Sequence, residues 1–255
     1  MAYDLNGRLA LVTGALGKLG PVWCSALAGA GATVVGIDVR DGEVAGLVGL
    51  EVADVTDRDA LLDVRDRLEA EFGVPDVLVN SAGIDQPPST DAGSVEIENV
   101  TLDDFRRTVE VNLAGTFLVT QVFGSRMRDE GRGSVVNIGS LYAAIAPDPL
   151  MYDHFDLDPP FLKPPAYGAS KAGVLNLTRY FARLWGPSGV RVNALSPGGV
   201  AGGQDGEFVR KFTERTPLRR LAEPEDLVGP LLFLASDASS YVTGHELRVD
   251  GGFTA

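Results

Sequence analysis

Tyr167 and Lys171 stand four residues apart in the sequence YGASK. In a helix this spacing places both side chains on one face, one turn apart. A free phenol has a pKa of about 10 and is a poor base at neutral pH. An ammonium about 4 Å away in a partly desolvated site offsets the roughly 4 kcal/mol needed to bring that pKa near 7. The pair predicts a tyrosine that exchanges a proton with an alcohol or carbonyl, although such pairs more often lie on a solvated helix surface.

Composition limits the classes of protein to which this chain can belong. Its 255 residues, 45% of them hydrophobic, suffice for one large α/β domain. The formal net charge of −13 argues against nucleic acid and anionic membranes as partners. Cys24 is the only cysteine and no His, Asp and Glu cluster has metal-ligand spacing, so we expect neither a disulfide framework nor a metal. No apolar run reaches the roughly 18 residues of a membrane span and no export signal is visible, so we expect a cytoplasmic protein.

Strand and helix patterns alternate along the chain, as a parallel sheet with helical crossovers requires. The expected strands are Arg8–Thr13, Thr33–Asp38, Leu50–Asp54, Val77–Asn80, Ser134–Ser140, Val190–Leu195 and Glu246–Val249. The expected helices are Gly17–Ala30, Asp57–Phe72, Asp103–Met127 and Tyr167–Trp185, with at most a brief helix in Arg40–Gly49. The pattern predicts a Rossmann-type α/β fold over residues 1–255, a single domain with a doubly wound, parallel, seven-stranded sheet flanked by helices.

Two irregular stretches, near residues 85–100 and 141–165, interrupt this alternation. Each leaves the carboxyl end of an expected strand, where open α/β sheets bind ligands. The second is rich in proline and carries Tyr152, His154 and Phe155. Loops of this length are uncommon and are usually functional or disordered. We favour an ordered wall of a substrate pocket for the second.

A glycine-rich turn follows the first expected strand. Gly14, Gly17 and Gly20 permit a tight turn and close backbone approach, and the following helix N-terminus favours a pyrophosphate. Asp38 ends the second expected strand, where a carboxylate accepts hydrogen bonds from the adenosine ribose hydroxyls and repels a 2′-phosphate. An ordinary strand-ending turn residue is the alternative interpretation of Asp38. The two features together favour a dinucleotide site.

With these motifs, the chain resembles the classical short-chain dehydrogenase/reductase family over nearly all of its length. The resemblance rests on motifs in a specific order and spacing, namely the glycine turn, Asp38, Asp54-Val55, Asn80-Ser81-Ala82-Gly83, Asn112, Ser140, Tyr167-x-x-x-Lys171, Pro197-Gly198 and Asp250-Gly251-Gly252. It implies an oxidoreductase that interconverts a secondary alcohol and a ketone by hydride transfer.

The resemblance also implies roles for individual residues. Ser140 would polarise the substrate oxygen, Tyr167 would exchange its proton, and Lys171 would lower the tyrosine pKa and bind the nicotinamide ribose. Asn112 would hold a water that links Lys171 to solvent. Separately from the resemblance, we expect Tyr142 and His154, which lie in the second irregular stretch, to contact substrate together with Ser140 and Tyr167, and a structural role is the alternative for His154. The implied cofactor is NAD, bound by Gly14, Gly17, Lys18, Leu19, Gly20, Asp38, Val39, Asp54, Val55, Asn80, Ala82, Gly83, Tyr167, Lys171, Pro197, Gly198 and Val200.

Four departures from the family pattern stand out. The helix after the second expected strand is curtailed, which leaves the adenine side of the expected site more open. Lys18 occupies the place of the usual middle glycine, a spacing that looks more like the longer, extended branch of the family. Gly202 stands five residues after Pro197, where the family often has a threonine on the carboxamide side. Ser140 and Tyr167 are separated by more residues than is usual, because the proline-rich loop lies between them.

The leading hypothesis is an NAD-dependent oxidoreductase with a small hydroxy or keto substrate, by analogy a sugar or sugar derivative. An NAD-dependent epimerase or dehydratase, suggested only by the glycine spacing, is one alternative. A dinucleotide-binding sensor without turnover is another, disfavoured because all four candidate catalytic residues are present. The long helix and the Tyr167 helix carry more apolar positions than one sheet face needs, and in the family such helices pair, so we expect a homotetramer, with a dimer as second choice.

Overall fold

A computed structural model describes residues 3–85 and 95–255 and contains one parallel sheet. The strand order is β3-β2-β1-β4-β5-β6-β7, and every neighbouring pair is parallel. The strands are β1 Leu9–Thr13, β2 Thr33–Asp38, β3 Gly49–Val52, β4 Val77–Asn80, β5 Gly133–Ile138, β6 Val190–Pro197 and β7 Glu246–Val249. The order reverses direction between β1 and β4, which creates the crevice where doubly wound sheets bind ligands. The predicted fold class is confirmed.

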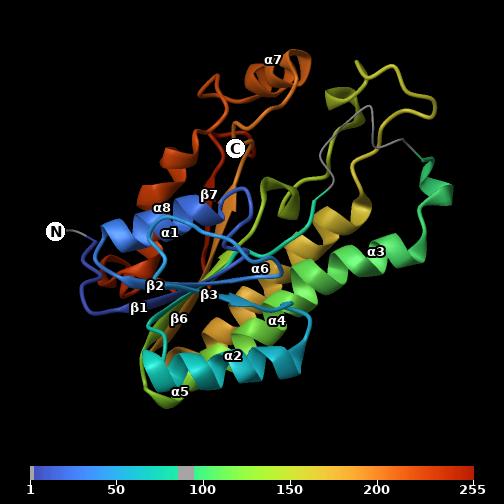
Figure 1. The fold of residues 1–255 in the computed structure, drawn as a ribbon. Helices are drawn as coiled ribbons and strands as arrows, with labels where there is room; N and C mark the ends of the chain where they lie inside the picture. The colour runs from blue at the N-terminus through green and yellow to red at the C-terminus, as the bar shows by residue number, and fades with distance from the viewer. Residues whose placement is uncertain (1–2, 86–94) are drawn as a thin grey trace.

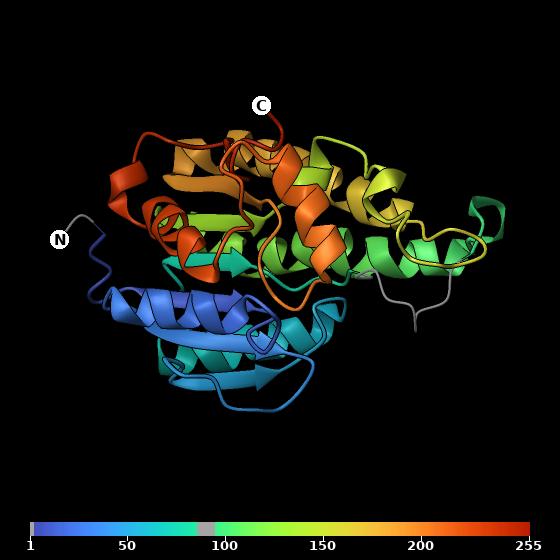
Figure 2. The ribbon, with the colours of Figure 1, turned by 90° about the horizontal axis from the view of Figure 1, so that it is seen from above.

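Helices cover both faces of this sheet (Figures 1 and 2). The helices are α1 Gly20–Gly29, α2 Arg58–Glu71, α3 Leu102–Val109, α4 Thr116–Val119, α5 Ser125–Asp129, α6 Pro165–Trp185, α7 Gly206–Arg215 and α8 Val228–Ala235. One buried cluster joins the sheet to α1 and α8, and a second joins its other face to α2, α6 and the run from α3 to α5. Strands such as β1, whose five residues are all buried, are apolar on both sides for this reason.

The expected long helix at Asp103–Met127 is a helical run interrupted by two wider turns. Glu110–Gly115 and Thr120–Gly124 adopt π-helical geometry between α3, α4 and α5. The run starts as the sequence indicates, because the Thr101 side chain accepts a hydrogen bond from the backbone N–H of Asp104. Such π turns often occur at functional sites, and the first of them contains Asn112.

Two helices, α7 and α8, are absent from the sequence expectation, and two expected segments differ. Pro230 obscures the α8 pattern, but it lies in the first helical turn, where the missing N–H has no helical partner to lose. Helix α1 begins at Gly20 rather than Gly17, because residues 14–19 form the glycine turn. Arg40–Gly49 contains no helix.

The stretch 141–165 is folded against α7 above the carboxyl ends of the strands. Short 3-10 turns form at Leu141–Ala143 and Pro149–Met151. A third buried cluster joins side chains of the stretch to side chains of α7 and the segment after it, namely Leu141, Met151, Tyr152, Phe161, Phe208, Phe212 and Leu221. The ordered wall that we favoured for this stretch is therefore present, whereas the first irregular stretch falls partly on residues 86–94, outside the described residues.

Candidate active site

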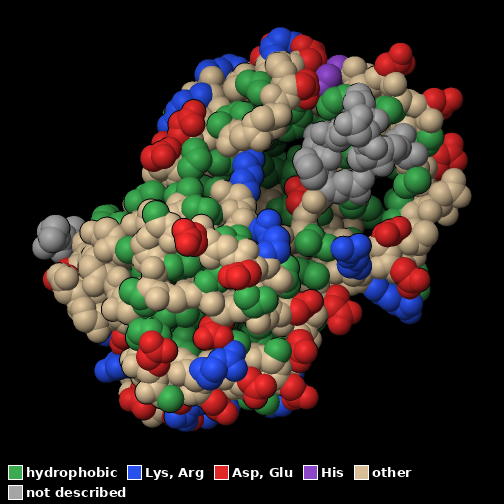
Figure 3. Space-filling view, viewed as in Figure 1, with side chains coloured by type: hydrophobic (Ala, Val, Ile, Leu, Met, Phe, Trp, Pro, Cys, Tyr) green, Lys and Arg blue, Asp and Glu red, His purple; other side chains and the backbone are tan. Residues whose placement is uncertain are grey.

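A cleft of about 1150 Å³ runs along the carboxyl edge of the sheet. It is visible as the hollow in the face shown in Figure 3. Most of the residues proposed from the sequence line it, namely Gly14, Gly17, Lys18, Leu19, Asp38, Val39, Asp54, Val55, Ala82, Gly83, Ser140, Tyr142, Tyr167, Lys171, Pro197, Gly198 and Val200. The cleft therefore brings together segments from nearly the whole chain.

The glycine turn at one end of the cleft fits a dinucleotide phosphate. Gly14 has a positive φ of 67°, and a Cβ there would lie 2.8 Å from the backbone of Ala82. A Cβ on Gly20 would lie 2.3 Å from the carbonyl oxygen of Ala15. The turn therefore requires glycine, without a Cβ atom, at these positions. Backbone N–H groups of the turn then lie beside the N-terminus of α1, where a phosphate can bind. Gly20 does not line the cleft; it allows α1 to pack closely on the turn.

Lys18 spans the cleft from the glycine turn to the segment after β6. Its ammonium donates to the carbonyl oxygen of Val200 at 3.4 Å. A Cβ on Gly202 would lie 2.4 Å from the lysine Cε and Nζ. The two departures from the family pattern are therefore linked, because Lys18 fills the space that a side chain at position 202 would need.

Asp38 lies at the adenosine end of the cleft and is almost fully buried. Its carboxylate accepts hydrogen bonds from the backbone N–H of Leu16 at 3.0 Å and from the Arg40 backbone and side chain at 3.2 and 3.3 Å. The Arg40 guanidinium also donates to the Leu16 carbonyl oxygen at 2.7 Å. Arg40 lines the cleft and was not proposed from the sequence.

Ser140, Tyr167 and Lys171 meet at the other end of the cleft. Ser140 follows β5, and its hydroxyl accepts a hydrogen bond from the backbone N–H of Tyr142 at 3.2 Å. The Lys171 ammonium donates to the carbonyl oxygen of Ile138 at 2.7 Å and lies 5.9 Å from the centroid of the Tyr167 ring. Burial lowers the pKa of Lys171 to about 8, an effect that the Asp85 carboxylate opposes. Lys171 is therefore protonated at neutral pH, although its pKa lies only a little above that pH.

Burial also raises the pKa of the Tyr167 phenol, because a phenolate would lose its hydration, and the Asp85 charge adds to this shift. A hydrogen bond with Ser140 partly opposes it. We had expected Lys171 to lower this pKa. In the protein without dinucleotide the pKa of Tyr167 is raised instead. The desolvation of the phenol outweighs the attraction of the Lys171 ammonium, which lies 5.9 Å from the ring centroid.

Asn112 and Asn80 support the cleft from outside its lining. The Asn112 carboxamide accepts from the Ile84 N–H at 2.7 Å and donates to the Ile84 carbonyl at 3.0 Å and the Ser170 hydroxyl at 3.2 Å. Asn80 donates to Thr120 and to the side-chain oxygen of Asn137, both at 2.8 Å. Asn112 thus fixes the segment after β4 against α6, whereas the water we assigned to it stays a prediction.

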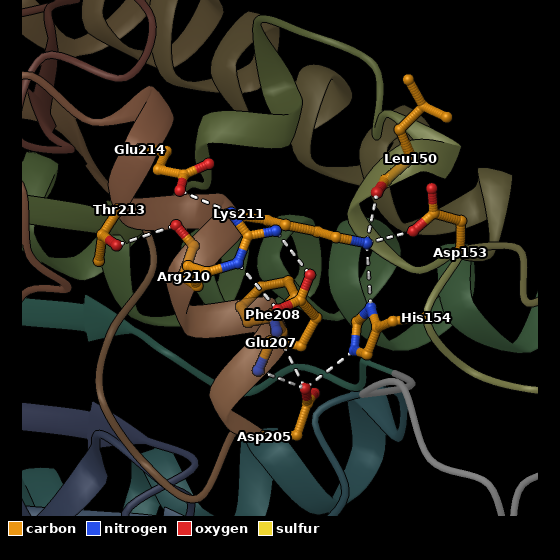
Figure 4. Close-up of polar contacts among 10 residues, drawn as sticks. All are labelled: Leu150, Asp153, His154, Asp205, Glu207, Phe208, Arg210, Lys211, Thr213 and Glu214. Atoms are coloured by element: carbon orange, nitrogen blue, oxygen red, sulfur yellow. Dashed lines mark hydrogen bonds and ion pairs between the residues drawn. The ribbon is translucent and has the colours of Figure 1, made fainter.

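His154 lies away from the cleft lining, contrary to the substrate contact we expected (Figure 4). Its Nε2 pairs with the Asp205 carboxylate at 2.8 Å, and its Nδ1 lies 3.3 Å from the Lys211 ammonium. Lys211 also pairs with Asp153. Both ring nitrogens are therefore engaged in joining the 141–165 stretch to α7, and neither points to a substrate.

Several lining residues were missed in the sequence. Tyr152 and Lys163 come from the 141–165 stretch, Asp85 follows β4, and Phe208 and Phe212 come from α7. Lys163 is the one lysine in a proline-rich stretch whose other charged residues are all aspartates, which was an available signal. The α7 residues gave no signal, because only the fold places that helix over the cleft.

Comparison with known proteins identifies the family. Residues 8–151 match the family model for short chain dehydrogenases, and residues 159–254 match a model described as enoyl-(acyl carrier protein) reductase. The chain belongs to the short-chain dehydrogenase family. It is accordingly an oxidoreductase acting on alcohol and carbonyl groups.

Three relatives are similar over almost their full length. D-threitol dehydrogenase of Mycolicibacterium smegmatis is 35% identical, with 99% of this chain and 95% of that protein covered. A Leptospira borgpetersenii short chain dehydrogenase with bound NAD+ has a TM-score of 0.88 at 33% identity, covering 100% and 95% of the two chains. A gluconate 5-dehydrogenase of Burkholderia cenocepacia, in complex with NADP and tartrate, has a TM-score of 0.86 at 30% identity, covering 99% and 97%. The similar proteins thus include complexes with either dinucleotide.

The direction of the Tyr167 pKa shift gives a first testable prediction. Because burial and Asp85 raise this pKa, the phenol should stay protonated at pH 10 in the protein without dinucleotide. Ultraviolet titration of the wild type and of Tyr167→Phe gives, by difference, the phenolate absorbance of Tyr167. This absorbance should appear only above pH 10. Asp85→Asn should move that ionisation to lower pH. Ionisation of Tyr167 at or below pH 10 would contradict this assignment.

Proposed function

We propose that the protein is an NAD-dependent dehydrogenase that oxidises one secondary hydroxyl of a sugar-like polyol to a ketone, and catalyses the reverse reduction. The observation that carries this proposal is the meeting of Ser140, Tyr167 and Lys171 at one end of a cleft that has Asp38 at its other end. The cytoplasmic location and the single-domain extent remain predictions from sequence.

Ser140, Tyr167 and Lys171 each have a separate role in this reaction. The Ser140 hydroxyl binds the substrate oxygen and holds it toward the phenol of Tyr167. In oxidation Tyr167 takes the hydroxyl proton as a phenolate, which forms only when added positive charge, from Lys171 and from a bound dinucleotide, offsets the raised pKa of the phenol. In reduction the neutral phenol returns the proton. A nicotinamide dinucleotide, when bound, supplies the hydride acceptor or donor. Lys171 adds positive charge beside the phenol, and its contact with Ile138 fixes its position.

Loss of the phenol oxygen tests the proton transfer. In Tyr167→Phe we expect kcat to fall on the order of 10²–10⁴-fold, the usual contribution of a positioned acid or base, with NAD affinity close to wild type. Steady-state kinetics and NAD titration measure the two quantities. Tyr180→Phe is a matched control, because Tyr180 lies on the same helix α6 but is 60% exposed. The idea fails if Tyr167→Phe keeps more than about a tenth of wild-type kcat.

The preference for NAD rests on Asp38. Its buried carboxylate lines the cleft where we place the adenosine ribose, and a 2′-phosphate there would meet a like charge. Arg40 and Lys18 are cations nearby that favour the phosphate. We infer that the repulsion of a 2′-phosphate by Asp38 outweighs its attraction to these cations, because the Arg40 guanidinium is already engaged in an ion pair with Asp38.

Removal of this carboxylate should change the cofactor preference. Asp38→Ala removes the repulsion and releases Arg40, so the ratio of NADP to NAD affinity should rise at least about tenfold, equivalent to about 1.4 kcal/mol. Titration of both dinucleotides into wild type and variant measures it. Asp38→Ala/Arg40→Ala should lose most of the gained NADP affinity. Wild-type protein that binds NADP as tightly as NAD would refute the assignment.

The substrate class is supported by the relatives and by the wall of the cleft. The relatives include dehydrogenases named for threitol and gluconate, and Tyr142, Tyr152 and Lys163 place polar groups along the cleft. The epimerase or dehydratase alternative predicts turnover without net NADH, and the sensor alternative predicts dinucleotide binding without turnover. Product analysis with a panel of polyols separates the three.

We also propose that the protein assembles as a homotetramer. Helix α6 and the α3–α5 run share a hollow lined by Leu113, Phe117, Leu177 and Tyr180, and Tyr180 is 60% exposed. A charge there would be desolvated by a partner subunit, so Tyr180→Asp should give smaller species at micromolar concentration in light scattering. Val48→Asp, at an exposed position beside β3, is the control. A monomeric wild-type protein would exclude this assembly.

A further inference from the structure

An ion pair beside Tyr167 neither donates nor accepts the transferred proton, although one of its members, Asp85, raises the pKa of the phenol. The Lys163 ammonium lies 2.7 Å from the carboxylate of Asp85 and 5.3 Å from the centroid of the Tyr167 ring. The Lys163 side chain is only 5% exposed, whereas that of Asp85 is 40% exposed. Both residues line the cleft. A substrate whose oxygen meets the Tyr167 phenol therefore has this pair among its near neighbours.

Each member of the pair adjoins a residue whose backbone is constrained. Asp85 follows Ile84, whose backbone N–H and carbonyl are both bound by Asn112. Lys163 immediately precedes Pro164 and Pro165, which open helix α6. Proline restricts its own φ and the conformation of the residue before it. The pair is thus positioned relative to Tyr167, which stands one turn into the same helix.

The stability of the fold does not explain this pair. Desolvation of a buried ammonium costs free energy that its partner only partly offsets, so such pairs are weak contributors to stability. Asp85 also acts against the tyrosine base, because its charge raises the pKa of Tyr167. An arrangement that adds little stability and opposes the base is better explained by recognition of a ligand.

We propose that Lys163 and Asp85 form a subsite for the hydroxyl next to the reacting carbon, which makes the enzyme selective for neutral vicinal diols. The ammonium donates to a hydroxyl oxygen and the carboxylate accepts from a hydroxyl hydrogen, so the pair matches both sides of a hydroxyl group. The hydroxyls of Tyr142 and Tyr152, which lie 3.0 Å apart, extend the polar wall. This inference rests on the proposed dehydrogenase function and deepens it.

Two other substrate chemistries fit the subsite less well. A methylene chain would cover the ion pair without replacing its lost hydration, which is costly for charged groups. A sugar-acid carboxylate would gain from Lys163 but would be repelled by Asp85 at similar range. The pair carries no net charge, which suits a neutral polyol.

The test compares two substrates that differ by one hydroxyl, cyclohexane-1,2-diol and cyclohexanol. Wild-type kcat/KM should favour the diol at least about 100-fold, because a site built to bind a hydroxyl is left unpaired by an analogue that lacks it. Lys163→Met and Asp85→Asn should each lower this preference on the order of ten-fold or more, the loss expected for a hydrogen bond to a charged group. Threitol should exceed an aldonate of equal length in kcat/KM.

The ratio between the two substrates is the decisive quantity. A changed charge beside Tyr167 alters the proton transfer equally for both, so that effect cancels in the ratio. Arg67→Met, which removes an exposed ion pair with Glu51 far from the cleft, should leave the ratio at the wild-type value. Asp85→Asn changes a partly exposed side chain, so it keeps the test decisive should Lys163→Met fail to fold.

Two outcomes would overturn the inference, and they are distinguishable. Equal kcat/KM for diol and cyclohexanol in wild type, or variants that reduce both substrates by the same factor, would refute the diol subsite and leave the dehydrogenase intact. Absence of NADH formation from every alcohol tested would instead refute the proposed dehydrogenase function, and the subsite with it.

Discussion

The buried ammonium of Lys171 is the constraint around which the active site is built. A cation removed from water needs oxygen partners, and the carbonyl of Ile138, at the end of β5, provides one at 2.7 Å. This contact fixes helix α6 against the sheet edge and so fixes Tyr167, one turn earlier. The pKa of Lys171, lowered to about 8, shows how narrowly burial and charge are balanced. A proton-transfer site with this balance responds strongly to any charge that enters the cleft.

The two ends of the cleft are organised by different kinds of force. At the dinucleotide end, glycines without Cβ atoms and a buried carboxylate leave backbone donors and one acceptor in place. At the substrate end, a separate apolar cluster packs the 141–165 stretch on α7. Polar contacts such as the hydrogen bond between His154 and Asp205 and the ion pair between Lys211 and Asp153 then join the two segments (Figure 4). Single polar contacts contribute modestly to stability, so the aromatic packing is the main contribution that holds the wall in place.

The motif residues were predictable because their chemistry is local. A few neighbouring residues suffice to recognise each of them: a glycine that must adopt a positive φ, a carboxylate at the end of a strand, and a Tyr–Lys pair at helical spacing. Alternating apolar segments likewise indicated the seven parallel strands. The helices α7 and α8 were not predicted. Asp205, which caps α7, was an available signal for the first, and Pro230 obscures the pattern of the second. Their placement depends on packing with distant segments.

The sequence by itself thus determined the fold class, the glycine turn and the candidate proton-transfer residues that the structure brings together. Only the tertiary structure decided which other side chains share the cleft. It brought Asp85 from the segment after β4 and Lys163 from the proline-rich stretch close to the same phenol, and it directed His154 toward Asp205 at the start of α7. It also reversed the expected shift of the Tyr167 pKa. The reason is physical: spacing along the chain specifies which groups are neighbours on one element, whereas desolvation and contacts between elements depend on the packed whole.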